Sequence, residues 1–390
     1  MTSPRAYDSI TEQDLRSIGG LKWSSFPEAT GAFVAEMDFG VAPPIHDAIE
    51  SAVAKGLFGY LPPALGAAMS QACADWQSAH YGWELPVANI RPLPDVLKGL
   101  EMTIEHFTEP GSAIVLPTPA YMPFLTIPAM LGRRIIEVPM LHQDGQWTMD
   151  YDGLDAACAD GGGMIIFCNP HNPIGKVYSR EEMTRLAELV DRHQVRVFAD
   201  EIHAPLVYPG AHHVPYASIS EVTAGHTVTS VSASKAWNLP GLKCAQIILS
   251  NEADLARWDQ VGMIAEHGAS NLGVVANTAA FTEGEPWLDG VREYLDGNRR
   301  LLAELIDEHL PGVHYDLPQG TYLAWLDCRE LGLAPNPAGF FLEHAQVACT
   351  DGALCGQVGT GFARFTFAMP GPVMVQAITR MGAAVRSQAH

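Results

Sequence analysis

The stretch SASKAWNLPGLK, residues 232–243, decides the fold. It places Lys235 among small and hydroxyl-bearing residues, directly after an apolar run, Thr227–Ser230, that predicts a buried strand. A lysine in this position can leave bulk water and act first as a covalent anchor for a carbonyl ligand and then as a general base. Taken alone, the stretch also fits two ordinary surface lysines, so other segments must decide. Three further residues of the stretch are candidates to contact a phosphate: Ser232, Ser234 and Lys243.

Two other polar segments follow predicted strands. NPHNPIG, residues 169–175, comes directly after the apolar run Met164–Cys168, and its amides and prolines suit a rigid hydrogen-bonding loop. In FADEIH, residues 198–203, Asp200 stands at the carboxyl end of another apolar run, where a buried carboxylate needs a cationic partner. Each segment alone also has a purely structural explanation, with Asn172 as a turn residue and Asp200 as a helix cap.

The order of apolar patterns predicts an α/β fold. From about residue 60 to 285, β-rich runs alternate with longer amphipathic stretches, which indicates a mostly parallel central sheet covered by helices. Ser179 and Glu182 form a capping box that predicts the start of a helix running through Val190. The predicted strands are Ala113–Leu116, Arg134–Val138, Met164–Cys168, Val195–Ala199, Thr227–Ser230 and Ala245–Leu249, followed later by Tyr322–Leu326 and Gly361–Ala368.

These patterns predict three parts of the chain. Residues 1–55 are expected to form an N-terminal segment that contributes to a small domain and to the active-site entrance. Residues 56–285 are expected to form the large ligand-binding domain, and residues 286–390 a smaller α+β domain. Ligands of such sheets bind beyond the carboxyl ends of the strands, which is where the polar segments lie.

Composition excludes several classes of partner. The 390 residues are 47% hydrophobic, enough for a large core. The 44 acidic and 23 basic residues give a formal charge of −21, which opposes binding to nucleic acids and anionic membranes. We expect a cytoplasmic protein without a membrane segment, because no apolar run reaches spanning length and the N-terminus lacks a secretion signal. The seven cysteines form no CxxC pair and the histidines lack zinc-ligand spacing, so no metal site is expected.

Together and in this order, the three polar segments resemble those of fold-type I enzymes that depend on pyridoxal 5′-phosphate (PLP), in the aminotransferase class I/II family. The resemblance implies the aspartate-aminotransferase-like fold, with PLP as the cofactor. It implies that Lys235 holds PLP as a Schiff base, that Asp200 pairs with the ring nitrogen and keeps it protonated, and that Asn172 bonds the 3-oxygen. His203 would support the ring.

Further matches cover nearly the whole chain and resemble the branch of cystathionine β-lyase-like C–S lyases, the MalY/PatB group. FVAEMDF, residues 33–39, is similar to the entrance segment of that branch, and its Asp38 is expected to bind substrate. Tyr60 matches a tyrosine that reaches the phosphate in the partner subunit, which implies a homodimer with shared active sites. Tyr121 matches the aromatic residue that stacks on the cofactor, and Arg364 matches the arginine that binds the substrate carboxylate. Without the resemblance, these would be ordinary core, interface or ion-pair residues.

The chain departs from the pattern of this branch at three places. The helix expected to present amides to the phosphate begins Asp95, Val96 and Leu97, and Asp95 stands where the family usually has glycine. An acid beside a phosphate is unfavourable. Pro205 replaces a common acid, and Thr366 replaces a frequent asparagine. These changes leave the cofactor assignment in place but weaken any claim to one substrate.

The resemblance implies α,β-elimination of a sulfur-containing amino acid. The substrate amine would displace Lys235, Arg364 would hold the carboxylate, and Lys235 would then remove the α-proton, with Tyr60 and Tyr121 as further catalytic candidates. Cleavage of cystathionine or another cysteine S-conjugate would give thiol, pyruvate and ammonia, as in methionine biosynthesis. The same residues would also serve an aminotransferase of amino acids. A PLP-binding regulatory protein is a further alternative.

Overall fold

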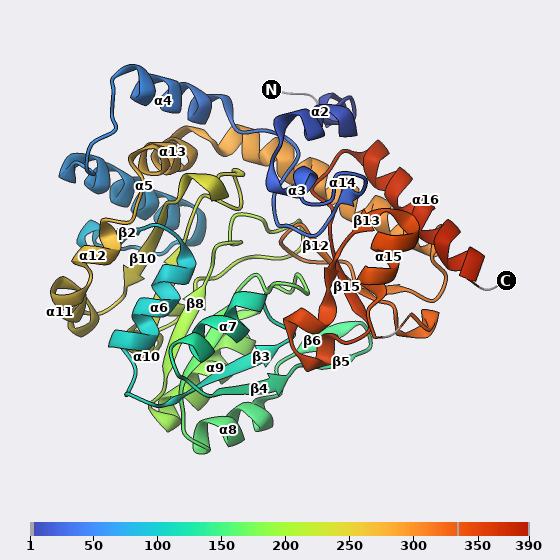
Figure 1. The fold of residues 1–390 in the computed structure, drawn as a ribbon. Coiled ribbons are helices and arrows are strands. Elements are labelled where there is room, and N and C mark those ends of the chain that lie inside the picture. The colour runs from blue at the N-terminus through green and yellow to red at the C-terminus, as the bar shows by residue number, and fades with distance from the viewer. Residues whose placement is uncertain (1–3, 334, 389–390) are drawn as a thin grey trace.

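The computed structural model describes residues 4–333 and 335–388. Residues 1–3, which begin the predicted N-terminal segment, and residues 389–390, which end the predicted C-terminal domain, lie outside the described residues. The described chain forms a large seven-stranded sheet and a smaller four-stranded sheet, with helices packed around both (Figure 1). Within these ranges, no helix is both long enough and apolar enough to cross a lipid bilayer.

The seven-stranded sheet is mostly parallel, as predicted. The five strands from β9 to β4 in its order run parallel to one another, and β10 is antiparallel to both of its neighbours. All six predicted strands are present, with ends shifted by at most two residues. In spatial order the strands are β2 (Ile90–Leu93), β10 (Ala245–Leu249), β9 (Thr227–Val231), β8 (Arg196–Asp200), β7 (Gly162–Cys168), β3 (Ala113–Thr118) and β4 (Ile135–Pro139).

Strand β2 is the one member of this sheet that was not predicted. It is short and contains Pro92, which cannot donate a hydrogen bond to a neighbouring strand. A proline is tolerated at the edge of a sheet, and β2 lies at the edge, paired on one side with β10. The pattern of residues 90–93 was therefore too short and too irregular to be recognised as a strand.

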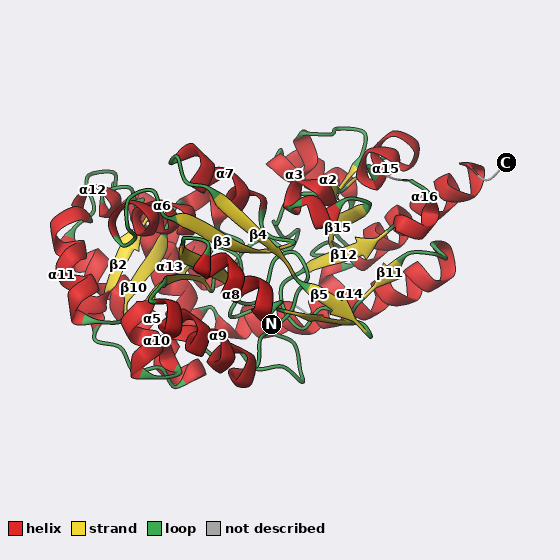
Figure 2. Cartoon of the chain, turned by 90° about the horizontal axis from the view of Figure 1, so that it is seen from below, coloured by secondary structure: helices red, strands yellow, loops and turns green. Residues whose placement is uncertain are grey.

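Four helices cover the two faces of the sheet beside the site: α6 (Val96–His106), α7 (Met122–Met130), α8 (Tyr151–Ala159) and α9 (Arg180–His193). Ile114 and Leu116 of β3 share a core with α6 and α7, whereas Val115 between them shares a core with α8 and α9. This alternation follows from the pleat, which points successive side chains to opposite faces. The sheet is thus enclosed by helices on both sides (Figure 2).

The predicted capping box at the start of α9 is confirmed. The Ser179 hydroxyl accepts a hydrogen bond from the Glu182 amide, and the Glu182 carboxylate accepts one from the Ser179 amide. The other helices around the large sheet are α4 (Pro43–Ala54), α5 (Pro63–Tyr81), α10 (Glu221–His226), α11 (Glu252–Val261), α12 (Met263–Glu266) and α13 (Asn271–Glu283), with a small hairpin of β5 (Leu141–Gln143) and β6 (Gln146–Thr148).

The smaller sheet is antiparallel and consists of β11 (His314–Tyr315), β12 (Leu323–Asp327), β15 (Phe362–Thr366) and β14 (Thr350–Asp351). Its helices are α14 (Glu285–His309), α15 (Pro337–Ala345) and α16 (Gly371–Gln388). The N-terminal segment contains α1 (Pro4–Tyr7), α2 (Glu12–Ile18), α3 (Leu21–Ser24) and β1 (Thr30–Gly31). Because β1 pairs with β13 (Val347–Ala348), this segment joins the C-terminal part of the chain. Helix α4 of the same segment packs against α13, one of the helices around the large sheet. The division of the chain at residues 55 and 285 stays a prediction.

Candidate active site

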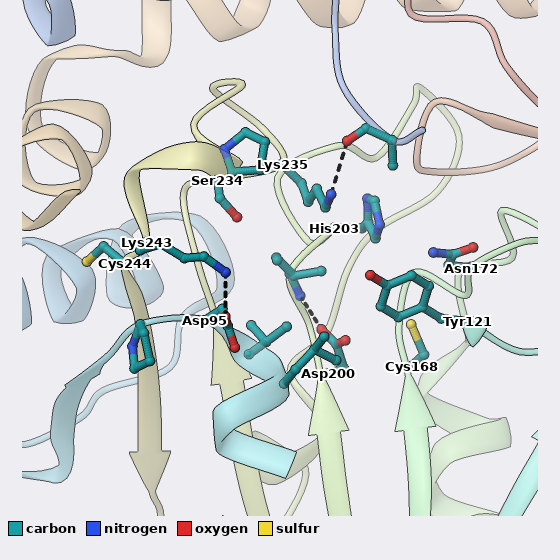
Figure 3. A pocket seen from close by; sticks show the side chains of 16 residues that line it. Asp95, Tyr121, Cys168, Asn172, Asp200, His203, Ser234, Lys235, Lys243 and Cys244 are labelled. Atoms are coloured by element: carbon teal, nitrogen blue, oxygen red, sulfur yellow. Dashed lines mark hydrogen bonds and ion pairs between the residues drawn. The ribbon is translucent and has the colours of Figure 1, made fainter. Parts of the chain in front are cut away.

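Ten of the predicted site residues meet in one cavity beyond the carboxyl ends of β7, β8 and β9 (Figure 3). Parallel strands present their ends at the same edge of the sheet, and this brings together segments that are far apart in the sequence. The predicted residues that line the cavity are Asp95, Val96, Leu97, Tyr121, Asn172, Asp200, His203, Ser234, Lys235 and Lys243.

The loop that carries Lys235 is anchored by its neighbour Trp237. The Trp237 ring is fully buried, packs edge-on against Trp76 and Phe281, and donates from its indole nitrogen to the Gly284 carbonyl at 3.0 Å. The Trp237 backbone amide also closes a turn by donating a hydrogen bond to the Ala233 carbonyl at 3.0 Å. Packing of this kind fixes the backbone and aims the Lys235 side chain into the cavity.

The Lys235 amine is held by one hydrogen bond and has a lowered pKa. Its Nζ donates to the Ala35 carbonyl oxygen at 3.0 Å. Burial, and after it the positive charge of Arg364, lower the pKa of Lys235 to about 8. A lysine with this pKa is neutral far more often near neutral pH than an exposed one, and only the neutral amine attacks a carbonyl or accepts a proton.

Asp200 is a buried carboxylate without an ion-pair partner in the described part of the chain. It is 3% exposed, and one of its oxygens accepts a hydrogen bond from the Ile202 amide at 3.1 Å. No lysine, arginine or histidine of the described residues forms an ion pair with it, and burial raises the pKa of Asp200 to about 7. A ligand cation placed against the Asp200 carboxylate would offset the free-energy cost of burying its negative charge. The carboxylate would in turn keep the ligand protonated.

Asn172 and His203 offer unused hydrogen-bonding groups to a ligand. The Asn172 amide oxygen accepts from Arg364 Nη1 at 3.2 Å, and because arginine has only donors, the Asn172 NH₂ group is left to donate elsewhere. Burial lowers the pKa of His203 to about 3, so its ring is neutral. Its Nδ1 is buried without a hydrogen-bond partner among the described residues. Tyr121 lies beside Asn172 with its ring at the cavity wall (Figure 3).

The start of α6 forms the opposite end of the cavity from Tyr121 and Asn172 (Figure 3). Val96 and Leu97 line it, so the first amides of the helix and its positive dipole end lie beside the cavity. Lys243 projects into the same end and forms an ion pair with Asp95 at 2.9 Å. Ser234, 9% exposed, completes this end.

Arg364 does not line the cavity itself, but it contacts the lining residue Asn172. It is buried on β15, and Nη2 donates to the Phe33 carbonyl at 2.8 Å and to the Thr350 hydroxyl at 3.2 Å. Its Nε is buried with no partner among the described residues. The guanidinium therefore retains donor capacity next to Asn172, at the join between the two sheets.

Besides Arg364, three predicted residues do not line the cavity. The Ser232 hydroxyl donates to the Cys244 carbonyl at 2.7 Å and accepts from the Ser234 amide, so it stabilises the lysine loop, and its contact with a phosphate stays a prediction. Asp38 is buried against Lys22 at 2.8 Å and Trp23 at 2.8 Å, because a carboxylate removed from water needs partners, and it does not face the cavity. Tyr60 is 96% exposed on the single chain.

Sequence reasoning missed the backbone of the entrance segment. The Ala35 carbonyl receives both Lys235 and the Tyr322 hydroxyl, the latter at 2.9 Å. The Asn238 side chain bonds both the amide and the carbonyl of Met37, each at 2.9 Å, and so fastens this segment to the lysine loop. A backbone carbonyl has no signature in the sequence, so its role could not be predicted. Asn238, in the stretch SASKAWN, was the one available signal, because its amide side chain can bond a backbone amide and a carbonyl together.

These groups together define the ligand that the cavity suits. A carbonyl carbon would meet Lys235, a protonated ring nitrogen would meet Asp200, and an acceptor oxygen would meet Asn172. An anionic group would meet Lys243 and the start of α6. A pyridine ring with a protonated nitrogen that carries an aldehyde, a hydroxyl and a phosphate satisfies all four conditions, so the residues fit a PLP-like cofactor.

Comparison with known proteins agrees with this chemistry. The family described as "Aminotransferase class I and II" matches residues 35–381. Cystathionine β-lyase of Corynebacterium glutamicum is 39% identical over 95% of this chain and 97% of its own, and cystathionine β-lyase PatB of Bacillus subtilis is 33% identical over 88% and 91%. The crystal structure of cystalysin from Treponema denticola, which contains PLP, superposes with a TM-score of 0.92 at 27% identity, covering 98% of this chain and 99% of that one.

The match spans most of the chain, and it includes every residue that lines the cavity, from Ala35 to Cys244, as well as the neighbouring Arg364. The predicted aspartate-aminotransferase-like fold and the predicted resemblance are therefore both confirmed. The chain belongs to the aminotransferase class I and II family, in the branch of the C–S lyases that includes cystathionine β-lyase PatB.

Proposed function

We propose that this protein is a PLP-dependent C–S β-lyase that converts cystathionine or related cysteine S-conjugates to a thiol, pyruvate and ammonia. One observation carries the proposal: a lysine of lowered pKa and a buried, unpaired carboxylate share one cavity in a chain 39% identical to a cystathionine β-lyase. PLP, when bound, supplies an electron sink for the bond-breaking steps.

The residues of the cavity would divide the work of holding PLP. Lys235 would bond its aldehyde carbon, Asp200 would pair with its ring nitrogen, and Asn172 would donate to its ring oxygen. Tyr121 and His203 would contact its ring. At the other end, Lys243, Ser234 and the amides of Val96 and Leu97 would face its phosphate.

The chain's own groups would then act on the substrate. Arg364 would bind the α-carboxylate with its spare donors. Lys235, displaced from the cofactor by the substrate amine, would accept the α-proton at Nζ, since its lowered pKa favours the neutral base. Tyr121, at the cavity wall, would be placed to assist proton transfer near the leaving sulfur.

We also propose a homodimer in which Tyr60 reaches the phosphate end of the partner's cavity. The loop that carries Tyr60 is fastened at Gly59, whose carbonyl accepts from Asn271 Nδ2 at 2.8 Å. Tyr60 is 96% exposed, and three other large apolar side chains in this loop and in α12 are exposed as well. Exposed apolar side chains of this size support burial by a second copy of the chain. They are Phe58, Met263 and Ile264.

The division into an N-terminal segment, a large PLP-binding domain and a small C-terminal domain belongs to this proposal. The small-domain assignment is supported by the pairing of β1 with β13. A cytoplasmic location and a role in amino-acid metabolism are part of the same proposal.

Incubation of the full-length protein with PLP and L-cystathionine is expected to release pyruvate and free thiol without any added keto acid. Replacing Lys235 by alanine should lower this rate by at least about 10³-fold, because the general base is lost. The exposed Lys55→Ala variant is the control and should keep the wild-type rate. Pyruvate and thiol are measured colorimetrically; product that forms only when a keto acid is present would identify an aminotransferase instead.

Replacing Asp200 by asparagine is expected to change how stability depends on pH in the cofactor-free protein. The folded pKa of about 7 lies above the ordinary value of 3.8, so Asp200 favours the folded state fully below about pH 4 and loses this contribution as the pH rises to about 7. The loss is up to about 4 kcal/mol. Urea unfolding from pH 4 to 8 should show this fall in the wild type relative to D200N, and PLP should reduce it. Parallel curves for the two proteins would contradict the assignment.

Replacing Arg364 by alanine is expected to raise KM for L-cystathionine about 30-fold or more, because the carboxylate loses charged hydrogen bonds worth ~2 kcal/mol. Arg364→Lys should lie between alanine and the wild type, since lysine keeps the charge but not the planar fork. Arg329→Ala is the matched control, because the exposed Arg329 side chain pairs with Asp327 at the end of β12. PLP affinity is measured in parallel. If R364A has the same KM as the wild type, the assignment of Arg364 to substrate binding is contradicted.

A further inference from the structure

The α6 end of the cavity contains an acid that already occupies the groups suited to an anion. Asp95 is the N-cap of α6, and its Oδ1 accepts a hydrogen bond from the Lys98 amide at 2.9 Å. Its Oδ2 pairs with Lys243 Nζ at 2.9 Å (Figure 3). One carboxylate therefore takes both a helix-terminal amide and a lysine, the two kinds of group that bind phosphate.

Few other cations are available at this end. Among the described residues that line the cavity, the cationic side chains are Lys235 and Lys243, and Lys235 is hydrogen-bonded to Ala35. Lys98, one turn into α6, is paired with Glu101 at 2.9 Å. Lys243 would therefore be the main cationic side chain to bind a phosphate at this end. The phosphate would compete for it with the Asp95 carboxylate, which is already paired with Lys243.

The local geometry keeps Asp95 and Lys243 together. Lys243 has a left-handed backbone, φ 52°, and its carbonyl accepts from the Ser270 amide at 3.0 Å, which fixes its position directly after the lysine loop. Asp95 is fixed by its capping bond. Neither residue needs to leave its backbone position to make the ion pair, so the contact costs little beyond side-chain ordering.

We propose that Asp95 is an internal competitor of the cofactor phosphate, and that it weakens the preference of this protein for PLP over the dephosphorylated aldehyde, pyridoxal. The inference rests on the proposed PLP cofactor. The negative Asp95 carboxylate repels a phosphate dianion and shares Lys243 with it, whereas pyridoxal lacks the phosphate and escapes this penalty. Retention of the cofactor then depends mainly on contacts that both aldehydes make, at Lys235, Asp200 and Asn172.

The test compares the two aldehydes on full-length protein freed of cofactor. Asp95→Asn removes the charge but keeps the size and the helix cap, since asparagine caps a helix as well as aspartate does. PLP and pyridoxal are titrated separately, and binding is followed by the visible absorbance of the ligand bonded to Lys235. In D95N the dissociation constant of PLP should fall about tenfold, while that of pyridoxal should stay within about twofold.

Three further variants make the comparison specific. Asp150 caps α8 in the same way, accepting from the Gly153 amide at 3.0 Å, and does not line the cavity. Asp150→Asn should leave both dissociation constants unchanged. Lys243→Gln should weaken PLP alone. Asp95→Ser also keeps a capping oxygen without the charge, so the PLP and pyridoxal titrations are repeated with this second substitution.

The inference is overturned if D95N binds PLP no more tightly than the wild type, if PLP and pyridoxal change equally, or if D150N reproduces the effect. Failure of the proposed PLP cofactor has a different signature, because the wild-type protein would then show no visible absorbance with either aldehyde. An Asp95 that helps to bind the phosphate would be recognised by weaker PLP binding in both D95N and the serine variant.

Discussion

Burial of Lys235 and Asp200 in one cavity is the constraint on which the site depends. Removal from water disfavours the charged form of each, so the lysine pKa is lowered to about 8 and the aspartate pKa is raised to about 7. These two shifts bring the groups into the range where both can exchange protons near neutral pH. A site of this kind is incomplete without a ligand that supplies a carbonyl to the amine and a cation to the carboxylate.

The scaffold explains how this cavity is maintained. Parallel strands bring the Asn172 loop, Asp200 and the lysine loop to one edge of the sheet, and the buried Trp237 holds the lysine loop in place. The smaller sheet contributes Arg364, whose hydrogen bonds reach both Asn172 and the Phe33 carbonyl of the entrance segment. One guanidinium therefore joins the two parts of the fold at the place where a substrate carboxylate would bind.

The strands could be predicted because local patterns specify them, whereas the roles of the principal site residues were predicted from the resemblance to a known family. Alternation of apolar runs predicted β3, β7 and β8, and the position of Asp200 and Asn172 at strand ends followed from those runs. The edge strand β2 was missed because it is short and contains Pro92. The sequence also could not reveal long-range partners: Asp38 is committed to Lys22, and the Ala35 carbonyl receives Lys235. Such contacts depend on tertiary packing between segments far apart in the chain.

The most direct test of the account is chemical labelling of the lysine. Borohydride reduction of the protein with bound PLP, followed by proteolysis and mass spectrometry, should place a phosphopyridoxyl group on the peptide that contains Lys235, in about one equivalent per chain. A yellow protein whose label lies on another lysine, or a protein that takes up no label, would contradict the account.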